Sequence, residues 1–212
     1  MVKMIGIVGN NSSKSTNRTL MQYIARRYKD QAEIDLFEVR DLPMFNKPLN
    51  GQIPEKAKEI AAKIEAADGV IISTPEYDLS IPAALSSALA WLSYNVYPFV
   101  DKPVMIVGAS YGVLGSSRAQ QHLRSILNAP VIRAIVMPGN EFLLGNSLQA
   151  FDENGELLFP DKVEQLDGYF SDFLKFIKIT EVLSSSHEAN VQEAASFYEK
   201  QFNYQGQGSE KR

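Results

Sequence analysis

Short apolar runs alternate with amphipathic stretches along most of the chain. Runs with the length and composition of buried strands lie at 4–9, 33–39, 69–74, 103–109 and 131–137. Apolar residues recur with helical spacing at 18–30, 54–67, 82–94, 116–128 and 161–179. This repeated order of strand and helix predicts an α/β protein with three layers (α/β/α), in which helices cover both faces of a parallel sheet.

Five parallel strands of this kind suit the flavodoxin-like strand order 2-1-3-4-5. In that order, ligands bind beyond the carboxyl ends of the first and third strands, where the strand order reverses. Polar or glycine-containing loops follow the first, third and fourth strands, at 9–17, 74–81 and 110–116. Because parallel strands end at the same edge of a sheet, we expect these three loops to lie together.

The C-terminal part of the chain has a different pattern. We expect one flavodoxin-like domain over 1–181, with a hairpin turn at 152–156, and a helical extension over 182–212. A helix is predicted at 188–202, and the polar tail at 205–212 is predicted to be disordered. The pattern leaves open whether this helix packs on its own domain or on a partner subunit.

The composition restricts the possible chemistry. The 212 residues include no cysteine and two histidines, His122 and His187, so disulfides and thiolate chemistry are excluded and a histidine zinc site is disfavoured. The net charge of −4 and the lack of a basic stripe argue against nucleic-acid binding. No apolar run is long enough to cross a membrane and no secretory pattern opens the chain, so we expect a cytoplasmic protein.

The first loop, residues 9–17, is rich in serine and asparagine and precedes a predicted helix. Free N–H groups and the helix dipole at such a position favour an anion, most often phosphate. Serine and asparagine are also ordinary turn and N-cap residues, so this loop alone does not decide between a site and a turn. The loop matches neither the nucleotide triphosphatase P-loop nor the dinucleotide-binding glycine pattern.

The second loop places Tyr77 between two carboxylates, Glu76 and Asp78. Pro75 and Pro82 bracket this loop and stiffen it, which suits a preorganised ligand site. The plainer interpretation is a solvated turn with an aromatic residue that packs into the core or an interface.

The third loop contains Gly112 and Gly115, which permit a close approach between the backbone and a ligand. An ordinary strand-to-helix turn also explains them. An esterase that uses Ser110 or Ser116 is a weak alternative, because the chain has no G-x-S-x-G motif.

Taken together, the three loops resemble those of the NAD(P)H-dependent FMN reductases, a flavodoxin-like family that includes quinone and azo-dye reductases. The most specific match is T-P-E-Y-D-L-S-I-P-A-A-L-S-S-A-L-A-W-L-S at 74–93, which is similar to the family pattern P-E-Y-N-x-S-x-P-G-x-L-K-N-A-x-D-W-L-S. R-A-Q-Q-H-L-R at 118–124 matches a second pattern. Asp78 departs from the expected asparagine.

The phosphate loop matches less closely. The family pattern G-S-x-R-x-x-S-x-N keeps its last serine and asparagine here, but Asn10 replaces the first serine and Ser12 replaces the arginine. Losing that arginine removes a cation that could meet a phosphate, and Lys14 lies close enough along the loop to compensate.

The resemblance implies an FMN cofactor, with NAD(P)H as co-substrate. The first loop would bind the FMN phosphate, the second would line the isoalloxazine and ribityl groups, and the third would line the other side of the ring. The implied cofactor-binding residues are Ser12, Ser15, Thr16, Asn17, Pro75, Glu76, Tyr77, Asp78, Ser110, Tyr111, Gly112 and Gly115.

The resemblance also implies an activity: a hydride passes from NAD(P)H to bound FMN and on to a flavin, quinone or azo compound, in a ping-pong cycle without a catalytic side chain. The alternative is a non-enzymatic FMN-binding electron-transfer module. A homodimer or homotetramer is implied, and we expect Leu89, Trp91 and Leu92 at its interface. Phe142, Leu143 and residues of the hairpin near Asp152 are predicted to cover the ring.

Overall fold

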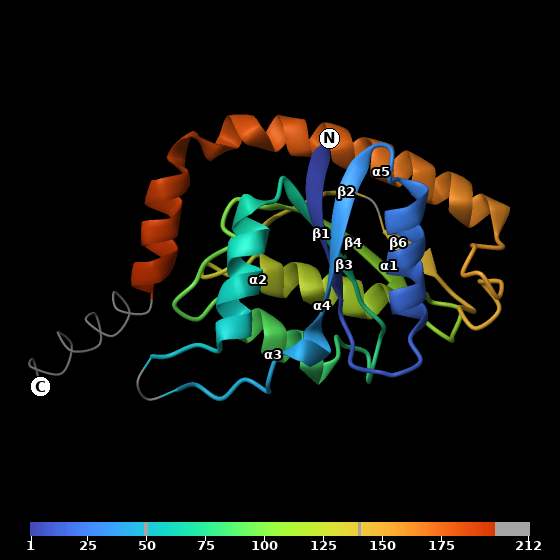
Figure 1. Cartoon of the computed structure of the whole chain (residues 1–212), viewed down its shortest axis with the longest axis horizontal. Helices are drawn as coiled ribbons and strands as arrows, with labels where there is room; N and C mark the ends of the chain where they lie inside the picture. Colours follow the sequence, from blue (N-terminus) through green and yellow to red (C-terminus); the bar gives the residue numbers. More distant parts are fainter. Residues whose placement is uncertain (49–50, 140, 198–212) are drawn as a thin grey trace, which may run out of the picture.

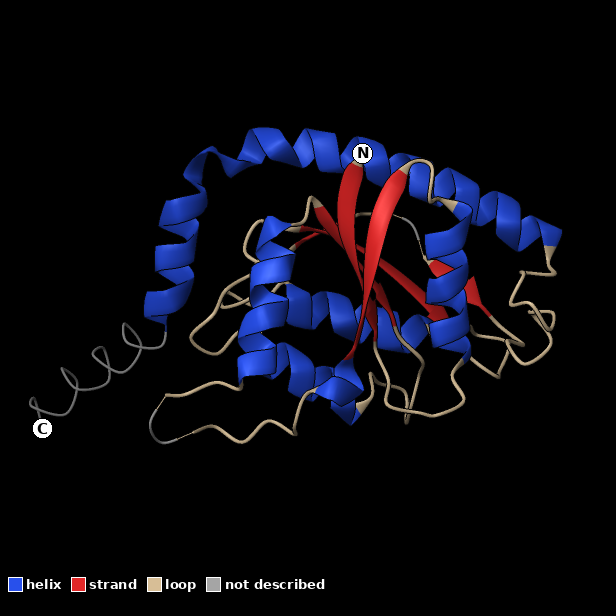
Figure 2. Ribbon diagram, viewed as in Figure 1, coloured by secondary structure: helices blue, strands red, loops and turns tan. Residues whose placement is uncertain are grey.

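The computed structural model describes residues 1–48, 51–139 and 141–197, and forms a parallel sheet with helices on both faces (Figure 1; Figure 2). The strands are β1 Val2–Val8, β2 Ala32–Glu38, β3 Gly69–Ser73, β4 Pro103–Ala109, β5 Ile135–Val136 and β6 Phe142–Leu144. Their order is β2-β1-β3-β4-β5, so the predicted flavodoxin-like topology is confirmed. Every residue of β3 and β4 is buried, which explains why these two segments read as continuous apolar runs.

Five helices make up the two outer layers of the domain. They are α1 Thr16–Arg27, α2 Glu55–Ala66, α3 Ala83–Trp91, α4 Ser117–Leu127 and α5 Pro160–Glu181. Figure 1 shows α1 and α5 on one side of the sheet and α2, α3 and α4 on the other, and each layer closes its own apolar core against the sheet. None of the described helices combines the length and apolarity that a membrane span requires.

The last strand differs from the prediction. In place of one strand over 131–137, the short β5 pairs with the first residues of β4, and β6 pairs with its last residues. Val131 and Ile132 instead lie in the turns that follow α4, where they are buried. An apolar run indicates that its residues are buried, and residues in a buried turn give the same run as residues in a strand. The predicted hairpin turn at 152–156 is confirmed by the bridge that joins residues 151 and 157.

The predicted subunit interface on α3 is wrong. Trp91 is only 5% exposed, and Leu89 and Leu92 are also buried within the chain. The indole Nε1 of Trp91 donates a hydrogen bond to the Pro43 carbonyl at 2.8 Å, and the Phe45 ring lies edge-on at 4.8 Å between centroids. The loop between β2 and α2 therefore covers this face of the helix.

The C-terminal extension folds back onto its own domain. After α5 and a short 3-10 turn, Val182–Ser186, residues 187–197 form a helix that lies alongside the α2 side of the domain (Figure 1). Asp101 accepts hydrogen bonds from His187 and Asn190, and Arg133 pairs with Glu193 at 2.6 Å. The rest of the predicted helix and the tail at 205–212 lie outside the described residues.

Replacing Trp91 with Phe should lower the free energy of unfolding by about 1–3 kcal/mol, because the Pro43 carbonyl loses the shorter of its two hydrogen bonds and the ring fills less volume. Urea unfolding followed by circular dichroism measures this change. The elution volume in size-exclusion chromatography should not move, since Trp91 is internal. A variant that keeps its stability but changes its oligomeric state would place Trp91 at an interface instead.

Candidate active site at the carboxyl edge of the sheet

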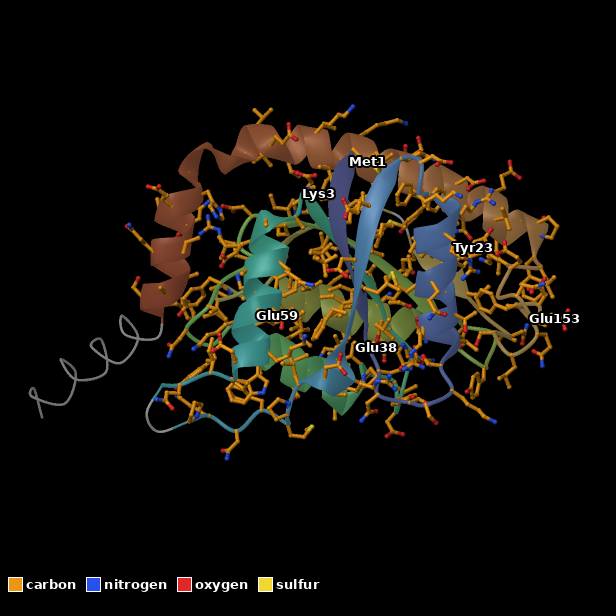
Figure 3. The ribbon with its side chains drawn as sticks, in the orientation of Figure 1. Met1, Lys3, Tyr23, Glu38, Glu59 and Glu153 are labelled. Atoms are coloured by element: carbon orange, nitrogen blue, oxygen red, sulfur yellow. The ribbon has the colours of Figure 1, made fainter. Side chains whose placement is uncertain are left out.

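A cavity of about 510 Å³ opens at the carboxyl edge of the sheet, between the three predicted loops. Its size is typical of sites for small organic ligands. Figure 3 shows Glu38 close to this edge and Lys3 near the opposite end of the sheet. Nine of the twelve predicted cofactor-binding residues line this edge cavity: Ser15, Thr16, Asn17, Pro75, Glu76, Tyr77, Ser110, Tyr111 and Gly112.

The N-terminus of α1 forms one wall of the edge cavity. Ser15 is the N-cap, and its hydroxyl oxygen accepts a hydrogen bond from the Arg18 N–H at 3.1 Å. The N–H groups of Thr16 and Asn17 belong to the first helical turn, which has no intrahelical acceptor. Together with the helix dipole they favour an anion at this wall.

The polar atoms of the Asn17 side chain are used in hydrogen bonds that join the loops. It is 1% exposed, and its Nδ2 donates to the Ala109 carbonyl at 2.8 Å. Its Oδ1 accepts from the Ser73 hydroxyl at 2.8 Å and from the Ala109 N–H at 2.9 Å. One amide thus ties the start of α1 to the ends of β3 and β4.

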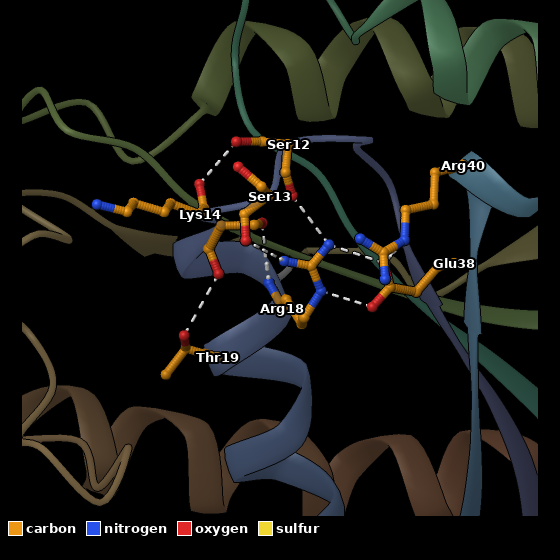
Figure 4. Close-up of polar contacts among 8 residues, drawn as sticks. Ser12, Ser13, Lys14, Arg18, Thr19, Glu38 and Arg40 are labelled. Carbon is orange, nitrogen blue, oxygen red and sulfur yellow. Dashed lines mark hydrogen bonds and ion pairs between the residues drawn. The ribbon is translucent and has the colours of Figure 1, made fainter.

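Arg18 does not line the cavity but holds the first loop through hydrogen bonds (Figure 4). Its guanidinium donates to the Ser12 carbonyl at 2.9 Å and the Ser13 carbonyl at 3.3 Å, and it forms a bidentate pair with Glu38. The hydrogen bond from Arg18 lowers the pKa of the Glu38 carboxyl, and the same bond raises the pKa of Arg18. The Ser12 hydroxyl donates to the Lys14 carbonyl within the loop, and Ser12 lies outside the lining of the cavity.

The Glu76 carboxylate accepts hydrogen bonds from the N-terminus of α4. One of its carboxylate oxygens accepts from the N–H groups of Arg118 and Ala119, at 2.9 and 3.3 Å, in the first turn of α4. A carboxylate at this position is favoured by the helix dipole. It fixes the second loop against α4 while Glu76 still lines the edge cavity.

A tight turn at 77–80 accounts for the position of Asp78. Tyr77 and Ser80 exchange backbone hydrogen bonds of 3.0 and 2.9 Å, and Asp78 and Leu79 between them both have positive φ, at 50° and 63°. Left-handed backbone at two successive non-glycine residues is costly. Asp78 is exposed on this turn and does not line the cavity, so its predicted contact with the cofactor stays a prediction.

The two glycines of the third loop differ in role. A Cβ at Gly112 would meet no atom within 4 Å, so the backbone there is open to a ligand. Gly115 has φ of 60°, and a Cβ there would lie 2.6 Å from the Leu143 carbonyl carbon, so this glycine lets the loop pack against β6. Phe142 is fully buried in the core, and its predicted place over a bound ring is therefore wrong.

The geometry gives no support to the esterase alternative. The Ser116 side chain is buried, and the Ser110 hydroxyl donates to the Gly112 carbonyl at 3.0 Å. The Nδ1 atom of His122 lies 2.6 Å from the Ser80 hydroxyl, whereas His187 bonds Asp101.

Sequence reasoning missed part of the lining. Asn10, Ala109, Val113 and Leu114 line the cavity together with Lys14. The sequence signal for Val113 is an apolar residue in a loop where polar residues are expected. In the structure Val113 is 78% exposed, as at a ligand or contact surface. Asn10 belongs to the first loop and directly follows Gly9, and this position in the loop could have identified it.

Replacing Asn17 with Ala should lower the free energy of unfolding by about 2–4 kcal/mol, because it leaves the Ser73 hydroxyl and both backbone groups of Ala109 without their partner. Chemical denaturation measures the loss. The matched control is Ser13→Ala, an exposed residue of the same loop, which should change stability by less than about 0.5 kcal/mol. Equal stability of the two variants would contradict the joining role of Asn17.

Comparison with known proteins identifies the family of the chain. The family model for NADPH-dependent FMN reductase matches residues 2–149. A subunit of the NADH:(hydroxy)cinnamate reductase of Vibrio ruber, CrdA, is 51% identical over 181 residues, which cover 85% of this chain and 90% of that protein. Subunit 2 of the NADH-dependent flavin reductase of Lactobacillus johnsonii is 46% identical over 182 residues, or 84% of this chain and 98% of that protein.

A solved structure has the same fold. The flavoenzyme NAD(P)H:(acceptor) oxidoreductase FerB of Paracoccus denitrificans superposes with a TM-score of 0.76 at 26% identity, covering 85% of this chain and 99% of that one. From the strand order, the loops at the carboxyl edge and these similarities, we conclude that the chain belongs to the NADPH-dependent FMN reductase family of flavodoxin-like enzymes.

Proposed function

We propose that this chain oxidises NAD(P)H with FMN held in the edge cavity, and that the electrons pass to a second, small-molecule acceptor. The observation that carries the proposal is the convergence of three loops, distant in sequence, on one cavity with the residues that the family resemblance assigns to the cofactor. The free N–H groups at the start of α1 suit the phosphate of FMN. The second and third loops would hold the ring system.

The cavity residues also fit the group chemically. Asn10 is buried in the cavity wall, and its Oδ1 has no hydrogen-bond partner in the described part of the chain. An unpaired buried acceptor is costly, and a hydroxyl of the ribityl chain is the kind of donor that would satisfy it. Gly112 leaves open space for a ring to approach the backbone.

When bound, FMN supplies the redox chemistry, accepting a hydride from the nicotinamide and delivering two electrons to the acceptor. The chain binds and orients the cofactor and both substrates. We propose that the two substrates use the same open side of the cavity in turn, which makes the cycle ping-pong. Flavins, quinones and azo compounds are the proposed acceptors. We expect NADH to be the better donor, because the names of both relatives specify it.

The alternative is an electron-transfer module that binds FMN but does not oxidise NAD(P)H by itself. It draws support from the names of the two relatives, each of which is a subunit of a larger reductase. The rim of the edge cavity carries exposed apolar residues suited to a protein contact, with Tyr111 at 60% and Val113 at 78% exposure.

We propose this rim, in place of α3, as the contact between subunits of a homodimer or homotetramer.

A spectrum and a rate measurement test the proposal. The purified chain should quench the fluorescence of added FMN and then oxidise NADH in the presence of a quinone. Binding without NADH oxidation would favour the electron-transfer module. A chain that binds no FMN would contradict both functions.

A pair of glycine variants tests the location of the site. Gly112→Leu should weaken FMN binding by about tenfold or more, because the new side chain occupies the edge cavity. Gly168→Leu on α5 is the matched control, since a Cβ at either glycine meets no atom within 4 Å. Fluorescence titration gives the dissociation constant of FMN for each variant. Equal dissociation constants would contradict the location of the FMN site in the edge cavity.

A further inference from the structure

The edge cavity has few cations for a phosphate. Arg18 is the arginine closest along the chain to its anion-binding wall, but its guanidinium is used by Glu38 and by the Ser12 and Ser13 carbonyls. Ser12 occupies the position where the resembled loops carry arginine. The start of α1 contributes only about half a positive charge, whereas a phosphate monoester carries about −1.5 to −2. The helix alone therefore leaves most of the charge of a phosphate unbalanced.

Lys14 is the candidate for the missing positive charge. It is the one lysine or arginine among the described residues that line the cavity. Its backbone carbonyl is fixed by the Ser12 hydroxyl at 2.7 Å. Its ammonium group extends from the loop without a carboxylate or carbonyl partner among the residues drawn (Figure 4). A cation that is anchored through its backbone but has a free head group is suited to bind an anionic ligand.

The Asn10 amide gives the wall a second, independent feature. Asn10 is 2% exposed, lines the same cavity and has an unpaired Oδ1 among the described residues. An amide oxygen accepts hydrogen bonds, so it fits a ligand hydroxyl and not a phosphate oxygen. The loop therefore presents an acceptor for a polyol at position 10 and a cation for a phosphate at position 14.

We propose that Lys14 is the residue that makes this cavity selective for the phosphorylated flavin over riboflavin, in place of the arginine that similar loops carry at position 12. Asn10 contacts the part that the two ligands share. This inference rests on the proposed function, because it assumes that the flavin occupies the edge cavity.

Dissociation constants for FMN and for riboflavin, measured by fluorescence quenching on the full chain, test the proposal. Lys14→Met should weaken FMN binding by about ten- to a hundredfold, as expected for loss of one charge-assisted contact, and should leave riboflavin binding unchanged. Lys14→Arg should keep the preference for FMN. Lys29→Met, the same change just beyond the other end of α1, should behave as wild type. Asn10→Ala should weaken both ligands by a similar factor.

Salt provides a readout that needs no variant. Raising the ionic strength should weaken FMN binding to the wild-type chain more than riboflavin binding. A Lys14→Met variant whose FMN-to-riboflavin preference equals that of wild type would overturn the inference while leaving the proposed function intact, as would a salt-independent preference. A wild-type chain that binds neither flavin would overturn both.

Discussion

The buried amide of Asn17 is the interaction on which the candidate site depends. It donates to and accepts from Ala109 at the end of β4, accepts from Ser73 at the end of β3, and belongs to the first turn of α1. A buried amide with all three bonds made is rigid, because breaking any of them leaves an unpaired polar group in the core. The first loop therefore ends, and the other two begin, at one fixed point, and the cavity between the three loops is preformed.

The charged residues around this point are used to hold the loops in position. Arg18 and Glu38 clamp the first loop from outside, and Glu76 binds the start of α4. The cavity itself is lined by neutral polar groups, aromatic rings, Lys14 and Glu76, whose carboxylate is already bound to the start of α4. Such a lining suits a site where a cofactor performs the redox step and the protein binds and orients it.

The fold could be predicted from the sequence where burial and periodicity agree. The apolar runs at 69–74 and 103–109 predict buried strands, and both are central strands of the sheet. Their alternation with helices predicts a parallel sheet, which suits the strand order observed. The single strand predicted from the run at 131–137 is wrong, because the first residues of this run are buried in turns. Trp91 misled for a related reason: an apolar helix face does not reveal that a loop with Pro43 and Phe45 covers it.

At the site, the loops could be located from sequence, but the direction of individual side chains could not. Ser12 and Asp78 sit in the predicted loops, yet a local hydrogen bond and a tight turn keep both out of the cavity lining. Gly115 serves the packing of β6. These outcomes depend on backbone geometry at single residues, which periodicity and motif spacing do not encode.

Hydrogen exchange with and without FMN tests most directly whether the three loops form one flavin site. The account predicts that FMN slows amide exchange together in residues 10–17, 75–77 and 110–114, and leaves the C-terminal helix at 187–197 unchanged. Protection confined to one loop, or located at the C-terminal helix, would contradict it.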